Sequence, residues 1–163
     1  MMRLLIVYWS LTGGTRQMAE AACAGAREEA GLDVVLSTAD EADAEEVLAA
    51  DGYMFAAPEN LATMAGAMKH FFDRTDYPVL DRVAGRAYGI LVCAGSDGEG
   101  AARQIARIAT GWRLRPIGDP IIVRTHAQTP EAILAPKVIG TADLERCREL
   151  GKAIAAGLVM GIF

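Results

Sequence analysis

Three hydroxyl side chains and two glycines lie close together near the start of the chain. Residues 10–15 read Ser-Leu-Thr-Gly-Gly-Thr, follow an apolar run at 4–9 and precede a segment with helical spacing of small and apolar residues. Glycines allow the chain to turn tightly with its N–H groups pointing inward, and the start of a helix has free amide donors and the positive end of the helix dipole. The segment therefore predicts an anion-binding loop.

The residue types in this loop restrict the anion. A Walker A loop needs Lys followed by Ser or Thr after its glycines, and a dinucleotide loop needs GxGxxG; the segment has neither pattern. Hydroxyl and amide donors can saturate a terminal phosphate monoester without a metal ion or a lysine. The expected phosphate-binding residues are Ser10, Leu11, Thr12, Gly13, Gly14 and Thr15. The alternative is an ordinary polar turn in which one hydroxyl caps the helix, although this loop has three.

Five short apolar runs alternate with five helical patterns. The runs, each suited to a strand buried on both faces, are residues 4–9, 34–36, 53–57, 88–94 and 121–123. The helical patterns cover residues 15–30, 44–50, about 64–73, about 98–112 and about 142–158. This alternation predicts an α/β fold with a parallel sheet, right-handed crossovers and helices on both faces.

Local signals mark several helix starts. Asp43 with Glu46, and Ser96 with Glu99, have the spacing of a capping box, so helices are expected just after Asp43 and Ser96. The least regular part of the chain contains Thr129-Pro130-Glu131, which predicts the start of a short helix.

Composition excludes several classes of function. The 163 residues are 52% hydrophobic and 23% charged, which predicts a single folded domain that spans residues 1–163. A net charge of −5 lacks the basic field that nucleic-acid binding needs. No apolar stretch approaches the roughly 20 residues of a membrane span. Three cysteines without a CxxC or Cys/His pattern indicate neither a disulfide framework nor a metal site, and suit a cytoplasmic location.

Isolated reactive side chains favour structural roles. Cys23 and Cys147 fall on the apolar faces of predicted helices, so both are expected in the core. His70 and His126 have no spaced carboxylate or cysteine partner. We therefore expect no catalytic side chain among them.

Residues 6–21 resemble the phosphate-loop signature of the flavodoxin family. The resemblance rests on Tyr8-x-Ser10-x-Thr12-Gly13-x-Thr15 with Ala19 following. Gly14 stands where Asn or Asp is frequent, and Ala22 stands where a branched aliphatic residue is preferred, but neither departure removes a phosphate donor. Because the family binds FMN, the resemblance implies FMN as the cofactor.

Residues 56–75 are similar to the region after the third strand in the NADPH-dependent FMN reductase branch of this superfamily. The residues that carry the similarity are Pro58, Gly66, Lys69, Phe71, Asp73 and Arg74. A strand that ends at a proline predicts a polar loop at the carboxyl edge of the sheet, where the flavin ring would lie. The implied flavin contacts are Pro58, Glu59, Asn60, Leu61 and Ala62. For Gly66, Lys69, Phe71 and Phe72 we favour a structural role.

A third loop corresponds to the other flavin-edge loop of the family. Its residues are Ala94, Gly95, Ser96, Asp97 and Gly98. Ser96 could instead serve only as a helix cap. The resemblance implies a three-layer, flavodoxin-like doubly wound fold with five parallel strands in the order 2-1-3-4-5. Strands one, three and four are neighbours in that order, so all three loops are expected to meet in one crevice.

The resemblance leaves three functions open. The leading hypothesis is NAD(P)H-dependent, two-electron reduction of a quinone or a free flavin, in which the flavin carries the chemistry and no side chain need act as acid or base. The second is a flavodoxin-type electron carrier that docks on redox proteins, and the third is a protein that kept the fold and lost the flavin. Carriers of this family stabilise half-reduced flavin by a peptide flip that glycine favours. Residues 58–63 contain no glycine and only Asn60 suits a left-handed conformation, which favours the reductase.

Partners and ring cover are also predicted. No aromatic residue lies in 58–62 or 94–111 to stack on a flavin ring, so the cover is expected from Trp9, Tyr77 or the second subunit of a homodimer supported by the apolar tail 158–163. A local basic patch could meet the 2′-phosphate of NADPH or an acidic redox partner, although a solvated helix face is favoured. The patch consists of Arg103, Arg107, Arg113 and Arg115.

Overall fold

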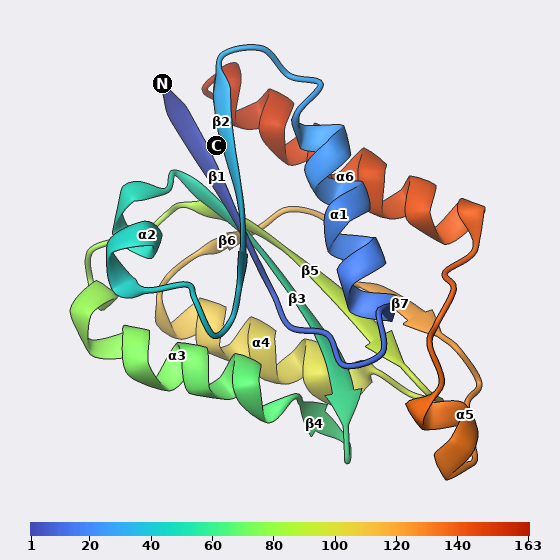
Figure 1. The fold of residues 1–163 in the computed structure, drawn as a ribbon. Coiled ribbons are helices and arrows are strands. Elements are labelled where there is room, and N and C mark those ends of the chain that lie inside the picture. Colours follow the sequence, from blue (N-terminus) through green and yellow to red (C-terminus); the bar gives the residue numbers. More distant parts are fainter.

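A mainly parallel sheet forms the centre of the molecule (Figure 1). The structure is a computed structural model that describes residues 1–163. Its strands are β1 (Met2–Tyr8), β2 (Leu32–Thr38), β3 (Gly52–Asn60), β4 (Thr63–Met64), β5 (Ala87–Ala94), β6 (Arg115–Pro116) and β7 (Ile121–Arg124). The order is β2-β1-β3-β5, and both β6 and β7 pair in parallel with β5, at its start and at its end respectively. The predicted fold and the order 2-1-3-4-5 are confirmed, with β7 as the fifth predicted strand.

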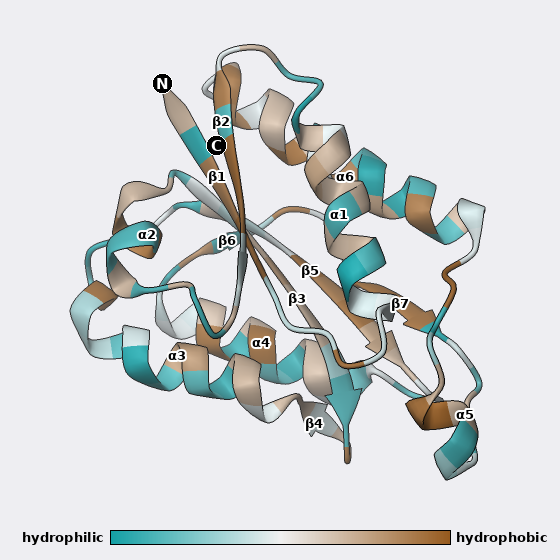
Figure 2. Ribbon diagram, viewed as in Figure 1, coloured by the Kyte–Doolittle hydropathy of each residue, from teal (hydrophilic) through white to brown (hydrophobic).

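Helices cover both faces of the sheet and complete three layers. They are α1 (Gly14–Ala26), α2 (Ala44–Ala49), α3 (Gly66–Val79), α4 (Glu99–Gly111), α5 (Pro130–Leu134) and α6 (Thr141–Val159). Two separate apolar clusters fill the spaces between the layers, one under α1 and α6 and the other under α2, α3 and α4. Figure 2 shows the apolar strands in the middle and polar positions on the outer sides of the helices. No helix combines the length and apolar character needed to cross a membrane.

Backbone contact joins α1 to α6. A Cβ atom added at Gly25 would lie 2.0 Å from the carbonyl oxygen of Arg148, and one added at Gly151 would lie 2.0 Å from that of Ala22. These glycines are therefore required for the close approach of the two helices. Both Cys23 and Cys147 are buried near this contact, which confirms their predicted place in the core.

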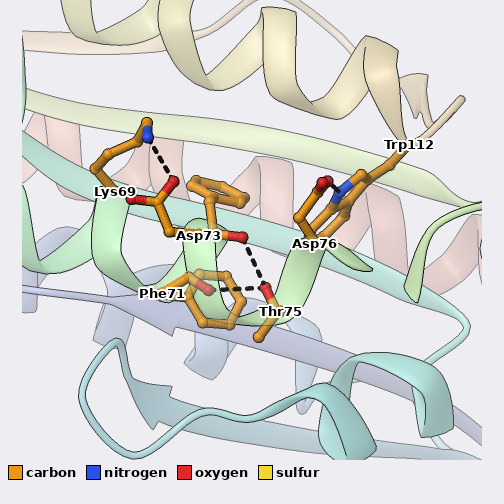
Figure 3. A network of polar contacts seen from close by, with 7 residues as sticks. Lys69, Phe71, Asp73, Thr75, Asp76 and Trp112 are labelled. Atoms are coloured by element: carbon orange, nitrogen blue, oxygen red, sulfur yellow. Dashed lines mark hydrogen bonds and ion pairs between the residues drawn. The ribbon is translucent and has the colours of Figure 1, made fainter. Parts of the chain in front are cut away.

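Aromatic side chains fix α3 against α4 on the opposite face. The rings of Phe55 and Phe72 pack edge to face with centroids 5.1 Å apart, and Phe72 and Trp112 do so at 5.5 Å. The indole nitrogen of Trp112 donates to Asp76 Oδ1 at 2.8 Å (Figure 3). This buried arrangement confirms the structural role expected for the apolar residues of α3, and it fixes the position of α4, the helix on which the loop after β3 rests.

Several predicted boundaries are wrong. The first helix ends at Ala26 and not near residue 30, because a turn with Gly31 at φ 82° follows it. The third helix begins at Gly66 and continues to Val79, well past residue 73, since Phe72, Thr75 and Val79 extend its buried face. The third strand runs to Asn60, where a loop was expected, and folds back to pair with β4. The predicted short helix after Thr129 is confirmed as α5.

Candidate functional site

A cleft of about 530 Å³ opens where β1, β3 and β5 end. The three loops predicted to converge all contribute to it, and a fourth segment, residues 125–137, forms the remaining side. The predicted site residues that line the cleft are Ser10, Leu11, Thr12, Gly14, Thr15, Pro58, Glu59, Asn60, Leu61, Ala62, Ala94, Gly95 and Ser96. Gly13, Asp97 and Gly98 do not line it.

The 10–15 loop presents polar groups that have no partner in the protein. Gly13 takes φ 94° and donates its amide to Ser10 Oγ at 3.1 Å, which closes the turn. The amides and hydroxyls of Thr12 and Thr15 form no hydrogen bond within the chain, and no side chain caps α1. Thr15 is only 2% exposed and lines the cleft. Free donors beside a helix N-terminus fit a phosphate dianion, whereas a turn with an ordinary side-chain cap would have satisfied one of them.

Hydrogen bonds to the segment before α6 hold the 10–15 loop in place. The amide of Lys137 donates to the carbonyl oxygen of Thr12 at 2.9 Å. The side chain of Gln17 donates to the carbonyl oxygen of Lys137 at 2.7 Å and accepts from the amide of Ile139 at 3.0 Å. A Cβ atom at Gly14 would lie 2.7 Å from the Cys93 sulfur, which explains why glycine replaces the Asn or Asp of the flavodoxin signature.

The second predicted loop is a tight β-hairpin. Glu59 pairs with Met64 and Asn60 pairs with Thr63, so Leu61 and Ala62 form its tip at φ 51° and 66°. The left-handed positions are therefore Leu61 and Ala62, and not Asn60, the residue of this segment best suited to that conformation. Two-residue hairpin turns that match the strand twist need positive φ at both central positions, and the register places Leu61 and Ala62 there. Both pay a steric cost that glycine would avoid.

Glu59 ties the hairpin to α4. Its carboxylate accepts from the amides of Gly98 at 2.9 Å and Ala101 at 3.0 Å. The expected capping role of Ser96 is wrong: Gly98 is the N-cap, at φ 91°, and the local side chain that contacts a helix amide is that of Asp97, whose Oδ1 accepts from the amide of Glu99 at 3.4 Å. A distant carboxylate thus satisfies the first amides of α4 and suits its positive end.

Two further contacts hold the hairpin against α4. Gln104 Oε1 accepts from the amide of Met64 at 3.0 Å. A Cβ atom on Gly100 would lie 2.1 Å from the Ala62 carbonyl oxygen, so the hairpin tip rests directly on the helix. The second and third loops therefore act as one unit.

Six residues of the cleft were not predicted from the sequence. They are Cys93, Thr125, Ala127, Gln128, Ile133 and Lys137. The segment after β7 joins the third loop through the amide of Thr125, which donates to the carbonyl oxygen of Ala94 at 2.8 Å. A signal was present: β7 is a parallel neighbour of β5, so the chain leaving it emerges at the same edge of the sheet.

The titratable groups of the cleft are engaged or neutral. Both oxygens of Glu59 accept hydrogen bonds, and the ammonium group of Lys137 donates to carbonyl oxygens at the end of α5, including those of Ala132 and Ile133 at 2.8 Å. Burial raises the pKa of the Cys93 thiol, and the Lys137 cation lowers it by less. The cleft therefore offers binding and orientation but no evident acid or base.

The apolar cover of the cleft is aliphatic, and neither of the aromatic residues predicted to cover the flavin ring lines it. Trp9 and Tyr77 do not line it, and Tyr77 is 85% exposed on α3. Leu11, Leu61 and Ile133 do line it, come from three different segments and are all exposed. They provide the apolar surface that a flat ring requires.

Comparison with known proteins identifies the family. Residues 38–129, which contain the hairpin and the third loop, match the family described as NADPH-dependent FMN reductase. The chain belongs to the NADPH-dependent FMN reductase family. The predicted membership in the flavodoxin-like superfamily is thereby confirmed, and FMN is the cofactor that this family implies.

Relatives of this FMN reductase family member extend the similarity over the whole chain. A flavodoxin from Aquifex aeolicus is 32% identical over 161 residues, which cover 94% of this chain and 85% of that protein. An NAD(P)H dehydrogenase (quinone) from Brucella ovis is 30% identical over 147 residues, 78% of this chain and 73% of that protein. A solved flavodoxin from the domain Archaea superposes with a TM-score of 0.78 at 23% identity, over 96% of this chain and 99% of its own, and shows the same fold.

Proposed function

We propose that this protein is an FMN-dependent oxidoreductase that oxidises NADH or NADPH and reduces a small acceptor such as a quinone or a free flavin. The unpaired donors at Thr12 and Thr15, in a chain of the NADPH-dependent FMN reductase family, are the observation that supports this most strongly. The quinone is suggested by the name of the relative from Brucella ovis, an NAD(P)H dehydrogenase (quinone).

Within this proposal the chain binds and orients, and the cofactor performs the chemistry. Bound FMN would supply a ring that accepts a hydride from the nicotinamide and a proton from water, and that returns two electrons and two protons to the quinone. The 10–15 loop holds the phosphate through hydroxyl and amide donors. The hairpin and the loop after β5 flank the ring, while Leu11, Leu61 and Ile133 shield it from water.

A one-electron carrier is the second candidate, because the Aquifex aeolicus flavodoxin matches almost the entire chain. A carrier needs a stable half-reduced flavin and a partner protein, but no substrate of its own. The hairpin has positive φ at Leu61 and Ala62 and is fixed to α4 by Glu59, so its peptide groups have little freedom to flip. This stiffness favours the two-electron reaction.

We also propose a homodimer in the cytoplasm. The support for a dimer is the set of exposed apolar side chains around the cleft and, at the other end of the chain, Met160 and Ile162. Phe163 folds back against Gly157 and is only partly exposed, so it offers less surface to a second copy than Met160 and Ile162 do. Three free, buried cysteines suit a reducing compartment. Light scattering of the FMN-loaded protein tests the dimer by its mass.

Anaerobic reduction tests the function. Protein purified with FMN is mixed with NADH or NADPH, and the visible flavin band is followed before and after addition of a quinone. We expect the nucleotide to bleach the band, the quinone to restore it, and excess quinone to sustain nucleotide oxidation. Bleaching by dithionite but by neither nucleotide would contradict the reductase and favour the carrier. No flavin band after loading would favour a protein that has lost its cofactor.

A further inference from the structure

The fourth side of the cleft is a segment that runs from the loop after β5 to the 10–15 loop. We call residues 125–139 the strap. Residues 128–136 within it are all exposed, and α5 has no buried residue. Figure 1 shows α5 at the periphery, outside the three layers. Gln128 and Ile133 of this exposed stretch nevertheless line the cleft, so the strap is held at the cleft by its two ends and not by a core of its own.

The first end of the strap is fixed by backbone contacts to the loop after β5. The amides of Thr125 and His126 donate to the carbonyl oxygens of Ala94 and Gly95, both at 2.8 Å. These hydrogen bonds continue the parallel pairing of β5 with β7, whose register ends at Ala94. The first end is therefore an extension of the sheet.

The second end is fastened by one backbone hydrogen bond and by the side chain of Gln17. Gln17 Nε2 donates to the carbonyl oxygens of Gly13 at 2.9 Å and Lys137 at 2.7 Å. Its Oε1 accepts from the amide of Ile139 at 3.0 Å, and the amide of Lys137 donates to the carbonyl oxygen of Thr12 at 2.9 Å. A side-chain amide has two N–H donors and one carbonyl, so Gln17 uses all of them. This residue thereby joins the 10–15 loop to the strap.

Between its two ends the strap forms hydrogen bonds only within itself. Thr129 Oγ1 accepts from the amide of Ala132 at 3.2 Å, and the ammonium group of Lys137 donates to the carbonyl oxygens of Ala132 and Ile133 at 2.8 Å. Residues 129–137 therefore form a compact unit that has no hydrogen bond to the rest of the protein except at Lys137. Release of the second end would let this unit move away from the cleft as one piece.

We propose that the strap closes over bound FMN and that Gln17 is the positioning residue that fastens it beside the phosphate. This rests on the proposed function for the identity of the ligand. Gln17 also holds the carbonyl oxygen of Gly13, in the loop where the donors of Thr12 and Thr15 stay free. Donors that are fixed before the ligand arrives bind it more tightly, because less conformational freedom is lost on binding.

The contribution of Gln17 should concern the phosphate more than the ring. Its side chain meets the strap at the 10–15 loop, whereas the end of the strap at the loop after β5 is held without Gln17. Riboflavin has the ring and lacks the phosphate. The ratio of the riboflavin dissociation constant to the FMN dissociation constant therefore isolates the effect of Gln17, since a general loss of stability would weaken both ligands alike.

Fluorescence titration of the full chain, freed of flavin, with FMN and with riboflavin measures this ratio. Gln17→Met keeps the length of the side chain and removes its three hydrogen bonds. We expect the FMN dissociation constant to rise about tenfold in this variant and the riboflavin constant to rise less than about twofold. Gln104→Met is the matched control, because it removes a hydrogen bond to the amide of Met64, on the hairpin side, and should leave the ratio unchanged.

Amide hydrogen exchange of the wild-type protein is a second measurement that does not depend on the folding of a variant. The amide of Ile139 is bonded to the Gln17 side chain, so its exchange reports whether the second end of the strap is fastened. We expect FMN to slow this exchange. Riboflavin should slow it less, because it lacks the phosphate beside which the strap is fastened.

Three outcomes separate this proposal from the proposed function. A wild-type ratio in Gln17→Met, or exchange at Ile139 that FMN leaves unchanged, would overturn the role of Gln17 and the strap even if a nicotinamide nucleotide reduces the flavin. Equal affinities for FMN and riboflavin in the wild type would overturn the phosphate loop and this proposal together. The expected ratios without reduction by either nucleotide would support the role of Gln17 and count against the proposed reaction alone.

Discussion

Glu59 Oε1 lies 2.9 Å from the backbone nitrogen of Gly98, and through this contact the β3–β4 hairpin supplies a cap that the N-cap residue of α4, a glycine without a side chain, cannot provide. One carboxylate thereby links two of the loops that border the FMN cleft. It also positions the neighbouring Asn60 and Leu61, which line both the cleft and a second hollow of about 710 Å³ between the hairpin, α3 and α4.

Replacing Glu59 with alanine should destabilise the protein. Loss of the cap leaves the amides of Gly98 and Ala101 unpaired, so we expect the free energy of unfolding in urea to fall by about 1–3 kcal/mol. Glu59→Gln keeps one acceptor oxygen and should lose less. Glu145→Ala, at an exposed position of α6, serves as the control and should change stability by less than about 0.5 kcal/mol. A Glu59→Ala variant as stable as the wild type would show that the contact between the Glu59 carboxylate and α4 does not stabilise the fold.

The hydroxyl groups of the 10–15 loop should contribute to the affinity for FMN, and the two histidines should not. Thr12→Ala and Thr15→Ala each remove a donor to the phosphate, so we expect the FMN dissociation constant to rise about tenfold. Thr15→Ser keeps the hydroxyl and should bind more tightly than Thr15→Ala. His70→Ala and His126→Ala should leave the constant unchanged, since neither residue lines the cleft. Flavin loss in the histidine variants alone, measured by fluorescence titration, would overturn this assignment of the site.

Relief of backbone strain at the hairpin tip should shift the redox behaviour. Ala62 has φ 66°, so Ala62→Gly should stabilise the fold by about 1 kcal/mol while giving the tip more freedom to flip. We expect the wild type to pass from oxidised to fully reduced flavin with little one-electron-reduced species, and Ala62→Gly to accumulate more of it. Stepwise anaerobic reduction followed by visible absorbance measures the amount of one-electron-reduced flavin in the wild type and in Ala62→Gly. A large one-electron signal already present in the wild type would favour the electron carrier.

Cys93 should react slowly with alkylating reagents, and only from the cleft. Burial raises its pKa above the ordinary value, and the thiolate is the reactive form, so alkylation should increase at a higher pH than for a free thiol. FMN should slow the reaction further because Cys93 lines the cleft at 7% exposure. Burial raises the pKa of Cys147 to about 12, so this thiol should stay unmodified in the native protein. Mass spectrometry of the labelled peptides measures both reactions. Alkylation of Cys93 at the same rate with and without FMN would contradict this expectation.

The sequence predicted what depends on local pattern. Alternating apolar runs and helical segments determined the layers, and hydroxyls with glycines at Ser10 to Thr15 marked the loop before α1. What it missed depends on contacts between distant residues. The capping spacing of Ser96 with Glu99 could not reveal that Glu59 takes the cap, because Glu59 and Gly98 are far apart in the chain.

The hairpin and the fourth side of the cleft were missed for related reasons. The sequence predicted that the third strand ends at Pro58. In the structure Pro58 is the last residue of β3 that pairs with β5, opposite Cys93, and β3 then continues because Glu59 and Asn60 pair with β4. The segment from Thr125 to Lys137 has no motif of its own. Its place follows only from the position of β7 beside β5.

Comparison of FMN with riboflavin by calorimetry tests the phosphate loop, on which the proposed function depends most. Riboflavin has the same ring and lacks only the phosphate. Because each charge-assisted hydrogen bond contributes on the order of 1.5–3 kcal/mol, we expect riboflavin to bind at least about a hundredfold more weakly than FMN. Thr15→Ala should narrow this difference by weakening FMN alone. Equal affinities for FMN and riboflavin in the wild-type protein would contradict the assignment of residues 10–15 as the phosphate site.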